Sequence, residues 1–288
     1  MLFFRCPICK SPLKDCGDHA QCPNRHSFDR AAEGYYHLLP SNKMHAKLPG
    51  DSKEMVAARR AFLNAGYYQL FSDGINEAAE KLLCDVQSPM ILDAGCGEGY
   101  YTARLKQALS ERRHDIRIAG FDISKFAVKA AAKRDKKIDF AVASIFDIPA
   151  ADGCCDLVLN VFAPIVPTEF ARVLKPGGVL LIAVPSERHL FGLKEILYES
   201  PYYNEKIDTV YEGFDFLERI PLRGTITITD SVQIANLFSM TPYYWKTPQA
   251  GCERLRQLAR LDTEIGFDLL LYRREQAGNN SLHPRSRT

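Results

Sequence analysis

The chain has 288 residues, of which 46% are hydrophobic and 25% are charged, and its formal net charge is +2. This composition is typical of a folded globular protein and excludes a disordered chain of low hydrophobicity. The longest apolar stretch, residues 178–185, is much shorter than the roughly 20 residues that cross a membrane, so we expect no membrane span. The first residues also lack a basic segment followed by an apolar core, and we therefore expect a cytoplasmic protein.

Residues 1–40 are expected to form a small zinc-binding module. They are interrupted by Pro, Gly and Cys, and four of the nine cysteines fall in the first 22 residues. In a cytoplasmic chain such a dense cluster favours a metal over disulfides. Two closely spaced pairs can each come from one tight turn and together hold one tetrahedral, structural Zn²⁺. The predicted ligands are Cys6, Cys9, Cys22 and His26, with Cys16 and His19 as alternatives.

Residues 41–85 are expected to be a linker followed by helices that cover a ligand site. The segment 41–52 is polar and basic. Ser52 can cap a helix over 53–63, because its side chain can accept from an otherwise unpaired backbone N–H. A second helical pattern runs over 69–84.

From residue 86 to residue 274, strands alternate with helices. This succession predicts an α/β domain with a mostly parallel sheet of about seven strands, covered on both faces. The expected strands are 90–94, 116–122, 139–143, 156–162, 179–184, 214–222 with 225–229, and 266–272. The expected helices are 100–109, 124–134, 168–174, 188–199 and 231–238. The remaining segment, 275–288, is expected to be a disordered tail.

A glycine-rich turn follows the first of these strands. Gly95, Gly97 and Gly99 lie between a strand and a helix, where small residues let the backbone approach a ligand closely. Such a turn alone also serves dinucleotide folds. Two acids make it more specific: Asp93 precedes the glycines, and Asp122 ends the next strand, where it can accept from both hydroxyls of a ribose.

These motifs resemble those of class I S-adenosylmethionine methyltransferases. The segment Leu-Asp-Ala-Gly-Cys-Gly-Glu-Gly at 92–99 is similar to the first motif of that family, and Asp122 matches its ribose-binding acid. Arg-Val-Leu-Lys-Pro-Gly-Gly at 172–178 is similar to another recurrent segment. The resemblance implies a Rossmann-like class I methyltransferase sheet, with Asp93, Gly95, Gly97 and Asp122 at the S-adenosylmethionine site.

Over nearly its whole length the chain also resembles the 23S ribosomal RNA guanine-N1-methyltransferases that act on hairpin 35 of the large subunit. This resemblance implies Zn²⁺ at the four predicted ligands, 23S rRNA as substrate, and a homodimer whose zinc modules line an RNA-binding cleft. It also implies cofactor contacts from Tyr68, Gly99, Tyr100 and His189. The segments that carry it are 6–9, 22–29, 33–35, 37–40, 49–52, 58–63, 66–68, 92–102, 188–190 and 240–242.

A zinc module in front of a methyltransferase domain favours a macromolecular substrate. Residues 1–60 hold ten Lys and Arg against six Asp and Glu, and residues 273–288 hold four against one. Basic residues can neutralise phosphates, and aromatic residues can stack on unpaired bases. The module and the start of the linker carry both kinds, namely Phe4, Arg5, Lys10, Lys14, Arg25, Phe28, Arg30, Tyr35, Tyr36, Lys43 and Lys47.

The sequence does not identify the catalytic base that removes the N1 proton of guanine. Candidates for a catalytic role are Asp147, Asp152 and Asn160, with His189 as a further base candidate that is preferred as a cofactor contact. The segment 160–164 is expected to line the pocket of the target base. Ser144 stands where many methyltransferases place an acid toward adenine.

Two other functions are compatible with the sequence. A small-molecule methyltransferase, acting for example on a quinone precursor, would need neither RNA nor the zinc module. A non-catalytic RNA-binding protein with a remnant cofactor fold would bind no cofactor, although the presence of both Asp93 and Asp122 argues against it.

Overall fold

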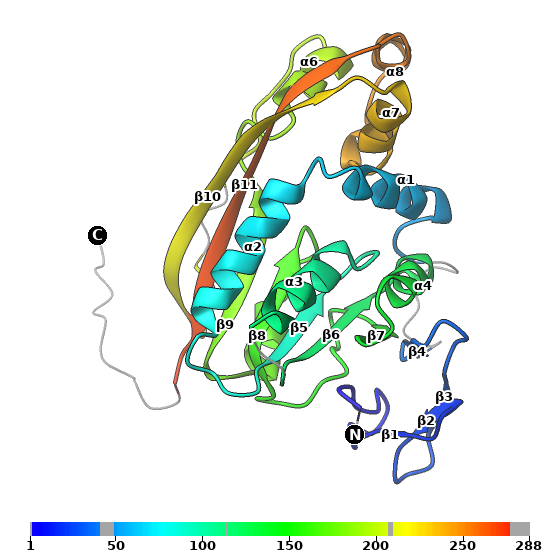
Figure 1. Cartoon of the computed structure of the whole chain (residues 1–288), viewed down its shortest axis with the longest axis vertical. Coiled ribbons are helices and arrows are strands. Elements are labelled where there is room, and N and C mark those ends of the chain that lie inside the picture. Colours follow the sequence, from blue (N-terminus) through cyan, green and yellow to red (C-terminus); the bar gives the residue numbers. More distant parts are fainter. Residues whose placement is uncertain (1, 41–48, 113–114, 207–209, 277–288) are drawn as a thin grey trace, which may run out of the picture.

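A large mixed sheet forms the centre of the molecule (Figure 1). The computed structural model describes residues 2–40, 49–112, 115–206 and 210–276. In these residues the sheet has eight strands in the order β10-β11-β9-β8-β5-β6-β7-β4. The six strands from β9 to β4 are parallel, and β11 and β10 are antiparallel to their neighbours. The strands are β4 Tyr36–His37, β5 Met90–Ala94, β6 Arg117–Asp122, β7 Asp139–Val142, β8 Cys155–Val161, β9 Leu174–Pro185, β10 Phe214–Ile228 and β11 Leu261–Arg274.

Helices cover the sheet, and the predicted α/β, Rossmann-like fold is confirmed. Alternate residues of the central strands point into two separate cores, so that Ile91 and Leu92 are both fully buried but pack on opposite faces. The helices are α1 Lys53–Asn64, α2 Gln69–Leu82, α3 Tyr100–Ser110, α4 Lys125–Arg134, α5 Pro167–Val173, α6 Phe191–Leu197, α7 Ser231–Ser239, the short 3₁₀ helix η2 Pro242–Trp245 and α8 Gln249–Arg256.

The N-terminal module is joined to the large sheet by backbone hydrogen bonds. Three short antiparallel strands, β1 Lys14–Asp15, β2 His19–Gln21 and β3 Ser27–Asp29, form its own small sheet. The next strand, β4, pairs in parallel with β7 and is the edge strand beyond the seven predicted. The backbone N–H of Arg5 also donates to the carbonyl oxygen of Pro149 at 2.8 Å. The module therefore shares backbone hydrogen bonds with the α/β domain.

The other edge of the sheet is a long antiparallel pair, β10 and β11. The sequence predicted two pieces of strand here, broken around residues 223–224, but β10 is continuous. Pro221 is tolerated because an edge strand does not need every backbone N–H for pairing. A Cβ at Gly224 would lie 3.0 Å from the Leu70 side chain of α2, so this glycine lets α2 pack closely on the strand.

Some expectations fall on residues outside this description. The first part of the linker, 41–48, and most of the tail, 277–288, lie outside the described residues. The predicted helix cap lies inside them and is confirmed, because Ser52 accepts from Met55 N–H. Ser124 caps α4 in the same way and accepts from Ala127 N–H. No helix in the described part of the chain is long and apolar enough to cross a membrane.

Candidate functional site

A cavity of about 860 Å³ opens at the carboxyl ends of β5, β6 and β8, where open α/β sheets bind their ligands. Seven of the eight residues predicted to contact the cofactor line this cavity, and Gly99 does not. The cavity is lined by Gly50, Asp51, Met55, Arg59, Leu63, Tyr68, Asp93, Gly95, Cys96, Gly97, Glu98, Tyr100, Tyr101, Asp122, Ile123, Val161, Phe162, Ala163, Pro164, Pro185, His189, Leu190, Asn204, Met240, Thr241, Pro242, Tyr243 and Trp245.

The three glycines of the turn have different physical roles. All three have a positive φ, which L side chains rarely adopt. A Cβ at Gly97 would meet no heavy atom within 4 Å, so this residue faces open space in the cavity. A Cβ at Gly95 would collide with Ala163, and one at Gly99 would lie 2.8 Å from the Cβ of Ala131. The close approach that the sequence predicted for a ligand therefore applies to Gly97, whereas Gly95 and Gly99 admit neighbouring chain segments.

Two carboxylates flank this turn, and the backbone holds one of them in place. The N–H groups of Gly97 and Ser124 donate to Asp122 at 3.1 and 2.8 Å. Because each carboxylate oxygen can accept more than one hydrogen bond, Asp122 keeps acceptor capacity toward the cavity. Its predicted place at the end of a strand, beside the glycine turn, is what the structure shows.

Asp93 has an oxygen without a partner. Thr102 donates from its hydroxyl to Asp93 Oδ2 at 2.5 Å, but Oδ1 is buried and has no hydrogen-bond partner among the described residues. Burial raises the pKa of Asp93 to about 7. Unpaired buried carboxylate oxygens are costly, so a ligand that offers a donor or a positive charge would stabilise this site.

Tyr68 and His189 form a hydrogen-bonded chain on the cavity wall. The N–H of Gly266 donates to His189 Nδ1 at 3.3 Å, which leaves the proton of the neutral ring on Nε2. Burial lowers the pKa of His189 to about 3, so the ring is neutral at physiological pH. Nε2 lies 3.4 Å from the Tyr68 hydroxyl and donates to it, and the Tyr68 O–H is left free to donate into the cavity. Both ring nitrogens are thus in use, and His189 is poorly placed to act as a base.

A segment before α1 closes one side of the cavity. A Cβ at Gly50 would lie 2.9 Å from the side chains of Ile123 and Ser124, so the chain passes very close to the end of β6. Ser124 also donates from Oγ to the carbonyl oxygen of Asp51 at 2.7 Å, and the Asp51 carboxylate pairs with Arg59. Arg59 is the one Lys or Arg among the described residues that line the cavity. Asp51 and Arg59 were not predicted as site residues, although both lie in segments that carry the family resemblance.

Exposed aromatic side chains also line the rim of the cavity. Phe162 is 47% exposed and has φ +55°, which is rare for a residue other than Gly, and Trp245 is 72% exposed. They come from the segment after β8 and from η2, respectively. Strained backbone of this kind clusters at functional sites. The predicted target-base segment, 160–164, therefore contributes Phe162. Trp245 was missed because it lies beyond the recognised segment 240–242 and has no motif of its own.

The predicted catalytic residues are not part of the cavity lining, although Asn160 contacts it. Asp147 pairs with Lys10 of the N-terminal module, and Asp152 pairs with Arg172. Asn160 is buried and donates from Nδ2 to the carbonyl oxygens of Ala94 and Pro164. It ties the end of β5 to the rim segment, which is a positioning role. Ser144 accepts from the N–H of Phe146 and also lies outside the lining.

The predicted metal ligands converge in the N-terminal module. One donor atom from each of Cys6, Cys9, Cys22 and His26 lies within 4.8 Å of the other three. His26 Nδ1 is 3.5 Å from Cys6 Sγ and 3.4 Å from Cys22 Sγ, and the thiols of Cys9 and Cys22 are 3.6 Å apart. Three thiols and one imidazole are the donor set of a structural zinc site. The alternative ligands lie outside the cluster, since Cys16 is exposed and His19 pairs with Asp18.

Comparisons with known proteins agree with both sites. The family described as "Methyltransferase domain" matches residues 87–236, and the zinc-ribbon family described as "RlmA, N-terminal" matches residues 4–47. The match over the Cys3His cluster identifies Zn²⁺ as its metal. We call residues 2–40 the zinc ribbon from here on.

Curated relatives extend over both regions. The chain is 32% identical to the 23S rRNA (guanine(748)-N(1))-methyltransferase of Streptomyces fradiae, over 90% of this chain and 91% of the relative. It is 29% identical to the putative 23S rRNA (guanine-N(1)-)-methyltransferase YxjB of Bacillus subtilis, over 93% and 96%. The demethylmenaquinone methyltransferase of Bacillus licheniformis is also 29% identical, but over 37% of this chain and 49% of the relative.

Proposed function

The chain belongs to the family of 23S rRNA guanine-N1-methyltransferases, and we propose that it transfers a methyl group from S-adenosylmethionine to N1 of one guanine in hairpin 35 of 23S rRNA. The observation that carries the proposal is the cavity itself. It holds the acids Asp93 and Asp122 around a glycine turn, and it also exposes aromatic rings to solvent. A nucleoside cofactor suits the acids and the turn, and an unpaired base suits the exposed rings.

We assign the cofactor to the side of β5 and β6. When bound, S-adenosylmethionine supplies the methyl group from its sulfonium. Asp122 would accept from the ribose hydroxyls, and the backbone at Gly97 would leave room for the nucleoside. Asp93 Oδ1 would accept from the methionyl ammonium, and Arg59, which also pairs with Asp51, would hold the carboxylate. Gly95, Gly99 and Tyr100 shape the turn.

Tyr68 is the proposed hydroxyl donor on this wall. Burial raises its pKa, so it stays protonated and keeps a proton to donate. His189 acts as a positioning residue, because its Nε2–H occupies one acceptor lone pair of the Tyr68 oxygen and directs the hydroxyl proton toward the cavity. The family resemblance implied that His189 contacts the cofactor. In this proposal His189 acts through Tyr68 instead.

The aromatic rim is assigned to the target base. Guanine N1 carries a proton and is a poor nucleophile, so the site must hold the base rigidly in line with the sulfonium while that proton leaves. Phe162 and Trp245 offer exposed ring faces for stacking beside the cavity. Trp245 is the one tryptophan of the chain, so quenching of its fluorescence by a hairpin 35 transcript reports on base binding directly.

Primer extension tests the proposal. Purified protein is incubated with S-adenosylmethionine and an unmodified 23S rRNA transcript, and reverse transcriptase is run through hairpin 35. Because methylation of N1 blocks base pairing, we expect a new stop next to one guanine. The stop should be weaker with Asp122→Ala at the same enzyme concentration and a subsaturating cofactor concentration, and absent with a transcript in which that guanine is replaced by adenine.

The small-molecule alternative makes a different prediction. It requires methylation of a compound such as a demethylated quinone in the absence of RNA, and full activity without the zinc ribbon. The match to the demethylmenaquinone methyltransferase covers 37% of this chain, whereas the rRNA methyltransferase of Streptomyces fradiae matches over 90% of it. Transfer to the quinone with no stop on 23S rRNA would overturn the proposal.

Family membership supports two further parts of the proposal. We infer a homodimer whose two zinc ribbons line an RNA-binding cleft, and a cytoplasmic protein, because its substrate is ribosomal RNA. Sedimentation at several protein concentrations tests the first part. A monomer at the highest concentration would contradict it.

A further inference from the structure

We propose that a row of lysines on α4 binds RNA phosphates along the path between the zinc ribbon and the cofactor cavity. The inference rests on the proposed function, since it takes RNA to be the substrate. The proposed surface belongs to the methyltransferase domain. The sequence analysis, in contrast, found the excess of basic residues at the two ends of the chain.

The row follows from helix geometry. Lys125, Lys129 and Lys133 are spaced four residues apart, so they lie along one face of α4, and all three are exposed. Residues 125–137 hold six Lys and Arg against one Asp, in a chain whose net charge is +2. The positive charge of the domain is therefore concentrated here, where it can attract a polyanion.

The two ends of α4 lie at the two functional regions. Its first residue follows the cap Ser124 and Ile123, which lines the cavity. Along its length, Lys129 and Lys133 lie 3.0 and 3.9 Å from Glu33 of the zinc ribbon. The ten residues of α4 span about 15 Å. In Figure 1, α4 lies between α1 and the zinc ribbon, as this path requires.

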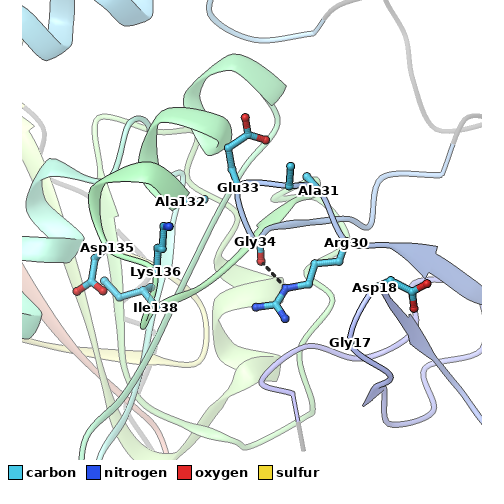
Figure 2. A pocket seen from close by; sticks show the side chains of 11 residues that line it. Gly17, Asp18, Arg30, Ala31, Glu33, Gly34, Ala132, Asp135, Lys136 and Ile138 are labelled. Atoms are coloured by element: carbon cyan, nitrogen blue, oxygen red, sulfur yellow. Dashed lines mark hydrogen bonds between the residues drawn. The ribbon is translucent and has the colours of Figure 1, made fainter.

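The row continues into a crevice between the zinc ribbon and the end of α4 (Figure 2). Arg30 of the zinc ribbon and Lys136 of the methyltransferase domain lie on opposite walls of this crevice, which has a volume of about 330 Å³. The crevice also contains carboxylates, but each is paired with a side chain outside the lining: Asp18 with His19, Glu33 with Lys129 and Asp135 with Lys106.

Glu33 and Asp135 are therefore each neutralised by a lysine, which leaves the charge of Lys136 unbalanced at this end of the row. The nearest carboxylate to Arg30 is that of Asp15 at 3.6 Å, and Lys136 forms no ion pair with a described residue. A phosphate in the crevice could contact both cations. An RNA whose target base enters the cavity and whose stem reaches the zinc ribbon would pass over this row, and each phosphate there would release counterions on binding.

The slope of affinity against salt concentration tests the proposal. The variant Lys125→Gln, Lys133→Gln, Lys136→Gln removes three charges and keeps Lys129, which holds Glu33 at the shorter distance. Binding of a labelled hairpin 35 transcript is measured by anisotropy between about 50 and 200 mM salt. We expect log Kd to depend on log salt with a slope smaller by about 2 to 3, and affinity at 0.1 M salt to fall about 10- to 100-fold.

A matched control separates this effect from loss of net charge. The variant Lys81→Gln, Arg256→Gln, Arg273→Gln removes three exposed charges elsewhere and should keep the wild-type slope. Zinc content and S-adenosylmethionine affinity of both variants should equal those of the wild type. An unchanged slope in the α4 variant overturns the proposal, and the proposed function stands if the wild type still methylates the transcript. A wild type that neither binds nor methylates it overturns both.

Discussion

The cofactor cavity and the zinc ribbon hold their ligands in opposite ways. In the cavity, Asp93 and Asp122 lie at the ends of neighbouring buried strands, and Asp122 is already fixed by two backbone N–H groups. In the ribbon, the metal ligands lie on short turns, such as the one closed by Cys22 N–H and the His26 carbonyl oxygen. The first site is organised by a large core, whereas the second is a segment of about 40 residues that needs its ligand to fold.

The two regions nevertheless share one sheet. β4 pairs with β7, and Phe3, Phe4 and Leu13 of the ribbon are buried in the same core as Leu92 of β5. Loss of zinc should therefore damage the β4 edge and this core, whereas the other face of the sheet packs in a separate core. Substitutions at the two sites test this contrast between a preformed site and a ligand-dependent one.

The largest effect is expected from Cys22→Ser. It should release zinc and unfold the ribbon, because a structural zinc supplies about 10–16 kcal/mol of folding free energy in zinc-finger peptides. RNA methylation should be abolished, while S-adenosylmethionine affinity changes little. Zinc analysis, limited proteolysis and calorimetry measure the three properties. Equal loss of cofactor affinity would show that the two regions fold as one unit.

Asp93→Asn should stabilise the protein at neutral pH and weaken cofactor binding. Because burial raises the pKa of Asp93 to about 7, the native state holds this proton between about pH 4 and pH 7 while the unfolded state has lost it. The free energy of unfolding therefore falls as pH rises through this window, by about 2–4 kcal/mol in total.

The asparagine variant removes this dependence. Its gain in melting temperature over the wild type should be absent near pH 4, grow up to pH 7 and then stay constant. Thermal unfolding across this range measures it. A gain that is the same at every pH would mean that Asp93 is not a buried ionisable group of the preformed site.

Asp122→Ala should weaken S-adenosylmethionine binding by about 1–3 kcal/mol, or about 5- to 150-fold, through lost hydrogen bonds to the ribose. Zinc content should not change, because Asp122 lies in β6 and all four zinc ligands lie in the ribbon. Calorimetry of the zinc-loaded variant measures both. Unchanged affinity would place the ribose elsewhere in the cavity.

The same contrast explains what the sequence could predict. The strands β5 to β9 and the acids at their ends have a strong local pattern, since buried strands are apolar and the glycines need positive φ. The Cys3His spacing is equally local. β4 has two residues and pairs with a strand more than a hundred positions later, so nothing in its own sequence marks it. The position and pairing of such a short strand are determined by long-range packing.

The residues of the cavity divide in the same way. Asp93, Gly97 and Asp122 were found because they lie inside one motif and the strand that follows it. Arg59 and Trp245 were missed because they reach the cavity from α1 and η2, whose positions depend on tertiary packing. The assignment of His189 needed the hydrogen bond from Gly266, which no sequence pattern contains.

The smallest effect is expected from Asp147→Asn, which tests whether the surface between the two regions takes part in the reaction. Asp147 pairs with Lys10 across the boundary between ribbon and domain, and the Lys10 side chain is 53% exposed. Such a pair contributes about 0–1 kcal/mol to stability, so the melting temperature should fall slightly at most. The methylation rate at saturating cofactor and RNA should stay within about twofold of the wild type, since a change of 0.4 kcal/mol is about twofold.

A matched variant, Asp152→Asn, breaks the pair with Arg172, which is part of the methyltransferase domain alone. It should also keep its methylation rate, because neither carboxylate lines the cavity. If one of these carboxylates is the catalytic base, its replacement lowers the methylation rate at saturation by at least about a hundredfold, while both substrates still bind. That outcome for Asp147 would mean that the boundary closes over the target base in the complex, and that the cavity is not fully organised before RNA binds.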